Sequence, residues 1–310
     1  MMKKTGVIGT GQMGTPMVLN LLRSGYEVWV YDVSEAAVRE LESAGAKRAD
    51  HPRAVAEQAD VLVLSLPNSA VLQQVVVGTE GILEADVRGK TILDTTTVTA
   101  KVAVELAEQV AARGGSMLDA PVTGGVAGAA QGNLNIMVGG DEAAFHEQLD
   151  VLQTLGSNVV YIGPSGHGQV SKMVNQSLMA ATYTAVSEAY AFAAQMNVDV
   201  GRVYQAIENG GAKSLVHSMM KSYIVSGDYA AGGAIQQHGK DIDYVMEEAN
   251  RHHSYMPVTS AVHEVWKMAR KEGAHTATLA PNSLFALWET MLGMKLNHAV
   301  KGNRKGTGGE

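Results

Sequence analysis

The chain is 310 residues long and carries 24 basic and 31 acidic side chains, for a formal net charge of −7. This length predicts about two domains of roughly 150 residues each. Cysteine is absent, which excludes disulfides, cysteine-based metal sites and a thiol nucleophile, and the acidic balance argues against binding to nucleic acid or to an anionic membrane.

Short apolar runs alternate with amphipathic stretches of helical length over residues 1–163. The runs are rich in Val, Ile and Leu, which is typical of parallel strands buried on both faces. They lie at Thr5–Ile8, Glu27–Tyr31, Asp60–Leu66, Lys90–Leu93, Ser116–Leu118, Asn133–Val138 and Asn158–Ile162. Helices are expected between them, for example at Gln12–Ser24, Ser34–Ala44 and Thr99–Arg113. This alternation predicts an α/β domain with a doubly wound, Rossmann-type parallel sheet.

The pattern changes after the sequence Gly163-Pro164-Ser165-Gly166. From His167 to about Met196 apolar residues recur at near-helical spacing, which predicts a long helix that joins the first domain to an all-α domain. Further helices are expected at Val200–Gln205, Ser214–Ser226, Ile235–His252, Pro257–Lys271 and Pro281–Met294. The predicted domains are residues 1–163 and 164–300, and the polar, glycine-rich residues 301–310 are expected to form a disordered tail.

A dinucleotide-binding fingerprint follows the first predicted strand and opens the first predicted helix. It reads Gly9-Thr10-Gly11-Gln12-Met13-Gly14. The first glycine permits a tight turn, the second lets the backbone approach a pyrophosphate, and the third lets the helix pack closely on the strand. The amino terminus of the helix offers N–H groups and a positive dipole end to the phosphates. The alternative interpretation is a structural turn that binds no ligand.

Asp32 ends the second predicted strand and can accept hydrogen bonds from the adenosine ribose. Its carboxylate would repel the 2′-phosphate of NADP, and the next two residues, Val33 and Ser34, include no arginine to hold that phosphate. NAD is therefore the expected cofactor and NADP the less favoured one. An ordinary helix-capping role is the alternative interpretation of Asp32.

Four segments with chemical character follow one another along the chain. They are GVIGTGQMGTPMVLNLL near the start, Ser65–Asn68, Leu118–Gly125 (LDAPVTGG) and Gly166–Asn175 (GHGQVSKMVN). In this order they resemble the β-hydroxyacid dehydrogenases, a 6-phosphogluconate dehydrogenase-like family that includes 3-hydroxyisobutyrate dehydrogenase and tartronate semialdehyde reductase. The resemblance implies an oxidoreductase that transfers a hydride between NAD(H) and a short-chain β-hydroxy acid or its semialdehyde. It also implies that residues 1–163 bind NAD and that residues 164–300 serve substrate binding and oligomerisation.

Hydride transfer from a hydroxyl-bearing carbon needs a group that takes the hydroxyl proton. A lysine can do this when desolvation lowers its pKa from about 10.4. The resemblance implies that Lys172 is this general acid/base. It also implies that Asn175, three residues further along the same helical face, orients the substrate. Composition alone would make Lys172 a solvated surface residue.

Thr123-Gly124-Gly125 follows a predicted strand whose carboxyl end should face the cofactor crevice. The glycine N–H groups and the threonine hydroxyl would together form a cradle for the substrate carboxylate. A flexible turn is the alternative interpretation. Family members often carry serine where Thr123 stands, so the hydroxyl is retained.

The resemblance assigns five further residues to cofactor binding, namely Leu66, Pro67, Thr96, Thr97 and Lys240. The first two end the third predicted strand and are expected to line the cofactor trough. The threonines end the next strand, where a hydroxyl would lie near the nicotinamide ribose, although a strand end that caps the next helix is also possible. The lysine matches a family residue that closes over the cofactor end of the cleft, with an ordinary surface lysine as the alternative.

Two positions depart from the family pattern. Many relatives carry an aromatic residue seven positions before Lys240 and an aliphatic one three positions before it, where this chain has Gly233 and Gln237. The substrate pocket is therefore expected to be roomier or more polar than usual. The particular hydroxy acid, the physiological direction and the pathway are left open.

Three other functions fit the sequence less well than that of a hydroxyacid dehydrogenase. An imine reductase on the same scaffold would generally have lost the lysine at position 172, and a non-catalytic dinucleotide-binding protein would be expected to lose that lysine or the cradle. A decarboxylating sugar-phosphate dehydrogenase usually has a longer helical half. The ten histidines show no ligand spacing with carboxylates, so no metal site is expected.

Location and partners follow from the absence of targeting signals and from the resemblance. No stretch approaches the roughly 18 uncharged apolar residues of a membrane span, and the first residues contain no cleavable apolar segment. We therefore expect a cytoplasmic enzyme that binds a small hydroxy acid or semialdehyde and neither nucleic acid nor membrane. Relatives form dimers or tetramers through the helical half, which implies a homodimer or a homotetramer.

Overall fold

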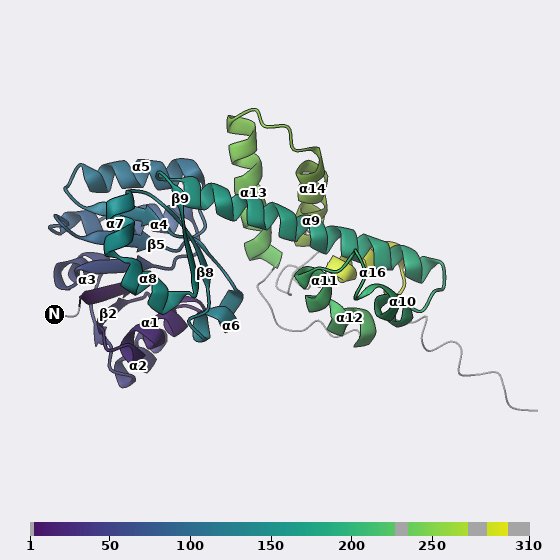
Figure 1. Ribbon diagram of the computed structural model, residues 1–310, viewed down its shortest axis with the longest axis horizontal. Helices are drawn as coiled ribbons and strands as arrows, with labels where there is room; N and C mark the ends of the chain where they lie inside the picture. The colour runs from purple at the N-terminus through teal and green to yellow at the C-terminus, as the bar shows by residue number, and fades with distance from the viewer. Residues whose placement is uncertain (1–2, 227–234, 272–283, 297–310) are drawn as a thin grey trace, which may run out of the picture. The chain divides into compact units, whose positions relative to one another are not determined.

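The computed structural model describes residues 3–226, 235–271 and 284–296. The chain divides into two compact units, Met1–Met173 and Val174–Glu310. The first contains strands and helices, and the described part of the second is helical, as Figure 1 shows. The predicted disordered tail at 301–310 and the first residues of the helix predicted at Pro281–Met294 lie outside the described residues.

A single sheet forms the centre of the first unit. Its strands are β1 (Lys4–Ile8), β2 (Glu27–Tyr31), β3 (Lys47–Arg48), β4 (Val61–Leu64), β5 (Thr91–Asp94), β6 (Ser116–Asp119), β7 (Val122–Thr123), β8 (Asn135–Gly139) and β9 (Asn158–Gly163). They are ordered β3-β2-β1-β4-β5-β6-β8-β7, and β9 pairs with β8. The strand order reverses between β1 and β4, and this switch point is where sheets of this kind bind nucleotides.

The sheet is parallel over most of its width and antiparallel near one edge. Strands β1 to β6 pair in parallel, whereas β8 runs antiparallel to β6 and β7. The predicted parallel character is therefore confirmed for the main part of the sheet, but the antiparallel course of β8, which β9 follows in parallel, was not expected. Its physical reason is that only residues 124–134 join β7 to β8, and a parallel crossover needs a dozen or more.

Helices cover both faces of the sheet, which confirms the doubly wound prediction (Figure 1). In β4, Val61 and Val63 join one apolar core and Leu62 and Leu64 the other, because successive strand residues point to opposite faces. The first core packs under α1 (Gly14–Arg23), α2 (Glu35–Ser43), α6 (Gly125–Ala130), α7 (Glu142–Glu147) and α8 (Leu149–Leu155). The second packs under α3 (Pro52–Gln58), α4 (Ser69–Val77), the 3-10 helix Ile82–Glu84 and α5 (Ala100–Ala111).

The long helix predicted from His167 is present as α9 (His167–Gln195), which contains 29 residues. Its residues fall in both units, since the division lies between Met173 and Val174. The helix ends shortly before Asn197, whose φ of 55° lies in the left-handed region. Asparagine is one of the few residue types other than glycine that readily adopt this conformation after a helix.

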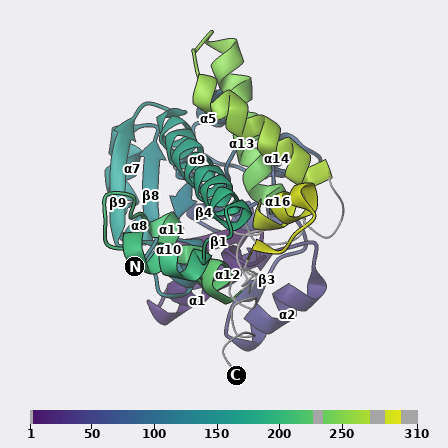
Figure 2. The same cartoon turned by 90° about the vertical axis from the view of Figure 1, so that its right-hand side faces the viewer.

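The described part of the second unit is helical, as predicted. Its remaining helices are α10 (Val200–Ile207), α11 (Leu215–Met219), α12 (Lys221–Ser226), α13 (Ile235–Arg251), α14 (Pro257–Lys271) and α16 (Leu284–Leu292). Figure 2 shows α13 beside α14. The single helix expected at 214–226 is instead the pair α11 and α12, separated at the fully buried Met220. In the described parts of the chain, no helix is both long enough and apolar enough to cross a membrane.

Candidate active site

The glycine-rich turn connects β1 to α1, and at two of its positions there is no room for a side chain. Gly9 has a φ of +90°, and a Cβ there would lie 2.3 Å from the Ser65 carbonyl oxygen. A Cβ on Gly14 would lie 1.9 Å from the Gly9 carbonyl oxygen. A Cβ on Gly11, by contrast, would meet no atom of the described residues within 4 Å. The chain itself therefore requires two of the glycines, while the third leaves open backbone of the kind that a pyrophosphate can approach. The residues present fit a dinucleotide.

Asp32 connects this turn to the end of β2. Its Oδ2 accepts a 2.6 Å hydrogen bond from the Thr10 N–H, and its Oδ1 accepts a 2.8 Å bond from the Ser34 N–H. Ser34, not Asp32, is the N-cap residue of α2. Because each carboxylate oxygen has two lone pairs, the partly buried Asp32 retains acceptor capacity for a ribose.

The residues predicted from β4 and β5 lie at the same sheet edge as the glycine turn, since both strands run parallel to β1. Thr96 is buried, and its Oγ1 accepts a 3.1 Å hydrogen bond from the Leu66 N–H. The loops after the neighbouring strands β4 and β5 therefore lie at one edge of the sheet, and this bond joins them. They contain Leu66, Pro67, Thr96 and Thr97. The helix-capping role falls on Thr99, whose Oγ1 accepts from the Val102 N–H at the start of α5. Capping therefore does not account for Thr96.

The predicted carboxylate cradle begins in β7 and continues into α6. Thr123 is partly buried, and Gly124 and Gly125 are exposed. Both glycines have positive φ angles, 131° and 64°, a conformation that glycine adopts without steric cost. A Cβ on Gly125 would meet no atom of the described residues within 4 Å. Backbone groups at this turn are therefore accessible to a small anion.

Lys172 is only 7% exposed, so the interpretation as a solvated surface lysine is wrong. Its Nζ donates a 2.9 Å hydrogen bond to the carbonyl oxygen of Val122. Val122 immediately precedes Thr123 in β7. The first turns of α9 therefore bring the predicted acid/base group next to the predicted cradle, although about 50 residues separate them in sequence.

Asn175 and Lys240 belong to the second unit, where one polar network connects α9 to α13. The Asn175 Nδ2 donates a 2.8 Å bond to the Gln176 Oε1, and the Gln176 Nε2 donates a 2.7 Å bond to the Asp241 Oδ2. Lys240 Nζ lies 3.4 Å from the other oxygen of Asp241 and 5.2 Å from the ring centroid of Tyr244. Lys240 is thus partly buried and paired, unlike an ordinary surface lysine.

The two positions that depart from the family pattern cannot both be placed. Gln237 is exposed on α13. Gly233 lies outside the described residues.

Two buried polar residues were missed by the sequence analysis, although both stand inside its motifs. Asp119 lies in LDAPVTGG and Gln169 in GHGQVSKMVN. Burial raises the pKa of the Asp119 carboxyl to about 6, while backbone N–H donors from Gly166 and Gln169 act in the opposite direction. The sequence feature that could have identified Asp119 is a carboxylate at the end of an apolar strand. A carboxylate buried there needs hydrogen-bond partners to offset the cost of desolvation.

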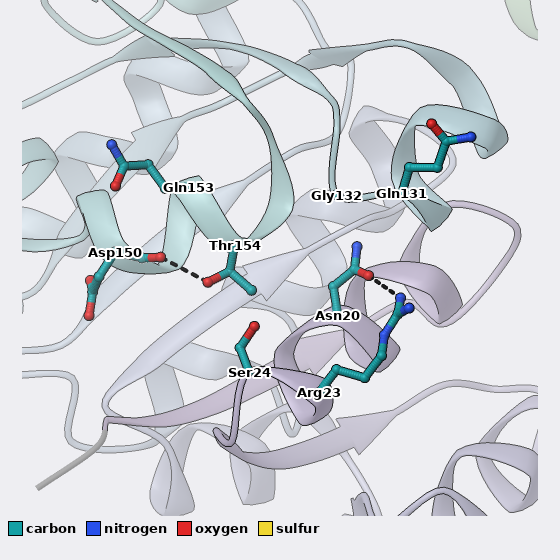
Figure 3. A pocket seen from close by; sticks show the side chains of 8 residues that line it. All are labelled: Asn20, Arg23, Ser24, Gln131, Gly132, Asp150, Gln153 and Thr154. Atoms are coloured by element: carbon teal, nitrogen blue, oxygen red, sulfur yellow. Dashed lines mark hydrogen bonds between the residues drawn. The ribbon is translucent and has the colours of Figure 1, made fainter.

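A polar pocket of about 500 Å³ lies elsewhere on the first unit, and Figure 3 shows its lining. The lining residues are Asn20, Arg23, Ser24, Gln131, Gly132, Asp150, Gln153 and Thr154. The residues predicted to bind cofactor or substrate are not among them. Several lining groups bond within the chain, since Arg23 donates to Asn20 and Thr154 donates to the Asp150 carbonyl oxygen. We therefore assign this pocket no role in the reaction.

Two known protein families together match most of the chain. Residues 4–163 match the NAD binding domain of 6-phosphogluconate dehydrogenase. Residues 166–280 match the family described as NAD-binding of NADP-dependent 3-hydroxyisobutyrate dehydrogenase. The chain belongs to the β-hydroxyacid dehydrogenase family. It is an NAD-binding oxidoreductase of the hydroxyacid dehydrogenase class, as the motifs predicted.

Two relatives extend the match over nearly the whole length. The chain is 35% identical to 2-hydroxy-3-oxopropionate reductase of Escherichia coli, over 94% of this chain and 99% of that protein. It is 33% identical to the mitochondrial 3-hydroxyisobutyrate dehydrogenase of Mus musculus, over 86% of this chain and 82% of that protein. Both proteins are named for reactions of short hydroxy acids or their semialdehydes.

Solved structures agree with this placement. A 3-hydroxyisobutyrate dehydrogenase from Salmonella typhimurium superposes with a TM-score of 0.82 at 28% identity, over 92% of this chain and 99% of that one. An imine reductase from a Pseudomonas species has a TM-score of 0.59 at 19% identity. Similarity at that lower level shows the shared fold alone, so the dehydrogenases are the nearer group.

Proposed function

We propose that this β-hydroxyacid dehydrogenase oxidises the hydroxyl group of a short β-hydroxy acid to the semialdehyde, and reduces the semialdehyde in reverse, with Lys172 as general acid/base. The observation that carries the proposal is the position of the buried Lys172 Nζ, 2.9 Å from the Val122 carbonyl oxygen. This carbonyl adjoins Thr123, so a proton acceptor and a carboxylate-binding turn lie together.

The proposed roles divide between binding and proton transfer. The Thr123 hydroxyl and the Gly124 and Gly125 N–H groups hold the substrate carboxylate. In oxidation the neutral Lys172 amine takes the hydroxyl proton while the carbinol carbon loses its hydride, and in reduction the ammonium returns that proton. When bound, NAD supplies the nicotinamide ring that accepts or donates the hydride.

The remaining predicted residues are assigned to holding the cofactor and completing the site. We assign residues 1–163 to cofactor binding, with the turn at 9–14, Asp32 and the loops at 66–67 and 96–97 as its contacts. Residues 164–300 are assigned to substrate binding and oligomerisation. Substrate orientation by Asn175 and a cofactor contact by Lys240 stay predictions that rest on the resemblance.

The substrate class follows from what the named substrates of the relatives have in common. Both 2-hydroxy-3-oxopropionate and 3-hydroxyisobutyrate have a three-carbon chain with a carboxylate at C1 and the reacting oxygen at C3. Apart from the oxidation state of C3, which is an aldehyde in the first and an alcohol in the second, they differ at C2, which bears a hydroxyl or a methyl group. We therefore propose a substrate with this C1–C3 chain.

A substrate panel tests the reaction class. The purified protein is mixed with NAD and with glycerate, 3-hydroxyisobutyrate or 3-hydroxypropionate, and NADH absorbance is followed. Propan-1-ol is the control, because it has the same chain without a carboxylate. We expect turnover of one or more of the acids and none of the alcohol. Reduction of a cyclic imine, with no turnover of any hydroxy acid or semialdehyde, would overturn the proposal.

Substitution of Lys172 tests the assignment of the proton-transfer group. Because Lys172 is buried, Lys172→Met preserves more of its packing than alanine does. We expect kcat to fall by roughly 10²–10⁴-fold, the usual contribution of a general acid/base. Lys172→Arg should fail similarly, since a guanidinium group does not release its proton. The Kd for NAD, measured by fluorescence, should be retained.

The control for that experiment is Lys101→Met, which alters a half-exposed lysine paired with Glu105 on α5. It should leave kcat unchanged. If Lys172→Met kept more than about a tenth of normal kcat, a proton-transfer role of this size would be excluded. Lys240 would then be the next residue to examine.

We also propose that the protein is a homo-oligomer, either a dimer or a tetramer. This is supported by an apolar face on α9, defined by Val174, Leu178 and Phe192. Each of these side chains is between 57% and 66% exposed, and their spacing places them on one side of the helix. The cytoplasmic location stays a prediction, and subcellular fractionation would check it.

A further inference from the structure

Asp119 joins the end of β6 to the beginning of α9. Its side chain is buried, and its Oδ1 accepts a 2.7 Å hydrogen bond from the Gly166 N–H. Its Oδ2 accepts a 2.9 Å bond from the Gln169 N–H. The first N–H groups of a helix have no partner within the helix. Here a carboxylate from a distant strand satisfies the Gln169 N–H, three residues before Lys172, and also the N–H of Gly166, which directly precedes the helix.

The backbone of α9 approaches the sheet closely at the same point. A Cβ on Gly168 would lie 2.5 Å from the carbonyl oxygens of Asp119 and Met137. A Cβ on Gly139, in β8, would lie 2.7 Å from Asp119 Oδ1. Real Cβ atoms do not tolerate such distances. The first turn of α9 therefore has very little freedom to shift relative to β6 and β8.

Gln169 holds the same turn from a second direction. Its side chain is fully buried, its Nε2 donates a 2.8 Å bond to the Thr96 carbonyl oxygen, and its Oε1 accepts a 3.1 Å bond from the Val98 N–H. Both partners belong to the segment after β5. Gln169 thus connects the helix that carries Lys172 to the segment assigned to the cofactor.

We propose that Asp119 and Gln169 are positioning residues, which fix the first turn of α9 so that the Lys172 amine reaches the Val122 carbonyl oxygen beside Thr123. This inference rests on the proposed role of Lys172. A lysine side chain has a long flexible stem, so its helix must be placed accurately for the amine to meet the substrate. A misplacement of about 1 Å in a reacting group can cost on the order of 10²-fold in rate.

The test compares two variants with two matched controls. Asp119→Asn replaces one acceptor oxygen with an NH₂ group that faces a backbone N–H, and Gln169→Met removes both side-chain hydrogen bonds. Asp141→Asn alters the aspartate that caps α7 through the Ala144 N–H. Gln109→Met alters an exposed glutamine on α5. The measurements are kcat, substrate KM, the Kd for NAD and the unfolding temperature.

We expect both test variants to lower kcat by about 10- to 100-fold, while the Kd for NAD stays within about threefold. The control Asp141→Asn should lower the unfolding temperature without lowering kcat, and Gln109→Met should change neither. A loss of kcat in the test variants but not in the destabilised control would separate a positioning role from a general loss of stability. If Asp119→Asn does not fold, Gln169→Met carries the test alone.

A double variant shows whether the effect passes through Lys172. In a Lys172→Met background, adding Gln169→Met or Asp119→Asn should lower the residual kcat by less than about twofold, because the group they position is gone. An equal loss in both backgrounds would overturn the inference, as would full kcat in both single variants. Neither result would affect the proposed function, which is tested separately by the substrate panel and by Lys172→Met alone.

Discussion

At the scale of single residues, the first unit places charged groups where backbone groups determine their surroundings. Asp32 accepts from two backbone N–H groups, Asp119 accepts from two others, and the Lys172 amine donates to a carbonyl oxygen. Backbone partners position a side chain without introducing a competing charge. The role predicted for each of these residues can be tested by a single substitution.

Cofactor choice is expected to depend on Asp32. The wild-type kcat/KM with NAD should exceed that with NADP by at least about tenfold, roughly 1.4 kcal/mol, because the carboxylate repels a 2′-phosphate. Asp32→Ala should narrow this ratio, although it also removes the hydrogen bond from Thr10. Steady-state rates with both cofactors provide the measurement, and equal use of the two by the wild-type protein would contradict the interpretation.

Recognition of the substrate carboxylate is expected to depend on Thr123. Thr123→Val keeps the shape of the side chain and removes the hydroxyl, so substrate KM should rise by about 5- to 30-fold for the loss of one hydrogen bond to a charged group. Thr123→Ser, which keeps the hydroxyl, should restore most of this loss. The Kd for NAD should not change in either variant. An unaltered KM in Thr123→Val would remove the hydroxyl from the cradle.

The pH dependence of stability is expected to reveal the burial of Asp119. Since burial raises the pKa of this carboxyl from 3.8 to about 6, the folded protein retains a proton there between these values that the unfolded chain has released. The stability from this group is complete below the unfolded value and is lost as pH rises through about 6. Relative to Asp119→Asn, the wild-type free energy of unfolding should fall by about 1 kcal/mol between pH 5 and pH 7.5.

Denaturant titration of both proteins at several pH values measures that difference. The asparagine variant is the control, because it has no titrating group at this position. A difference that stays constant with pH, or that grows as pH rises, would contradict the raised pKa.

At the scale of elements, the turn from β1 to α1 has glycines with two different purposes. A Cβ on Gly14 would collide with the Gly9 carbonyl oxygen, whereas a Cβ on Gly11 would not meet the described residues. Gly14→Ala should therefore destabilise the first unit by about 1–3 kcal/mol, as overpacking does. Gly11→Ala should leave stability nearly unchanged and weaken NAD binding. Thermal unfolding with and without NAD separates the two effects.

The Gly11→Ala result is the more specific test of the cofactor site. A saturating ligand at about 100 times its Kd stabilises the folded state by about 2.7 kcal/mol. Wild-type protein should show this increase, and Gly11→Ala should show much less at the same NAD concentration. Equal NAD-induced stabilisation of both proteins would mean that the pyrophosphate does not approach Gly11.

At the scale of the whole molecule, the exposed face of α9 is the feature most relevant to assembly. Leu178→Glu and Phe192→Glu each place a charge on this apolar face, and we expect them to shift the protein towards monomers. Val258→Glu is the control, because Val258 on α14 is as exposed as Leu178, at 66%. Analytical ultracentrifugation gives the molecular mass in solution. A monomeric wild-type protein would refute the proposal of a homo-oligomer.

The sequence by itself determined the features that arise from neighbouring residues. The limits of β2, the long helix from His167 and the glycine turn after β1 were predicted closely, because apolar periodicity and backbone freedom are local properties. The motif order was sufficient to indicate the family. The two-residue strands β3 and β7 were missed, and the short helices α3, α4, α7 and α8 were expected between strands without being given bounds, since segments this short carry little periodic signal.

Only the tertiary structure decided how distant segments meet. The antiparallel course of β8, the burial of Lys172 and its bond to the Val122 carbonyl oxygen depend on contacts between parts of the chain far apart in sequence. The bonds of Asp119 to the start of α9 span 47 and 50 residues. The sequence of a motif does not show whether a polar side chain in it faces solvent or a buried backbone group. Its partner is set by packing of the apolar cores, which brings β6, β7 and α9 together and leaves those backbone groups to be satisfied.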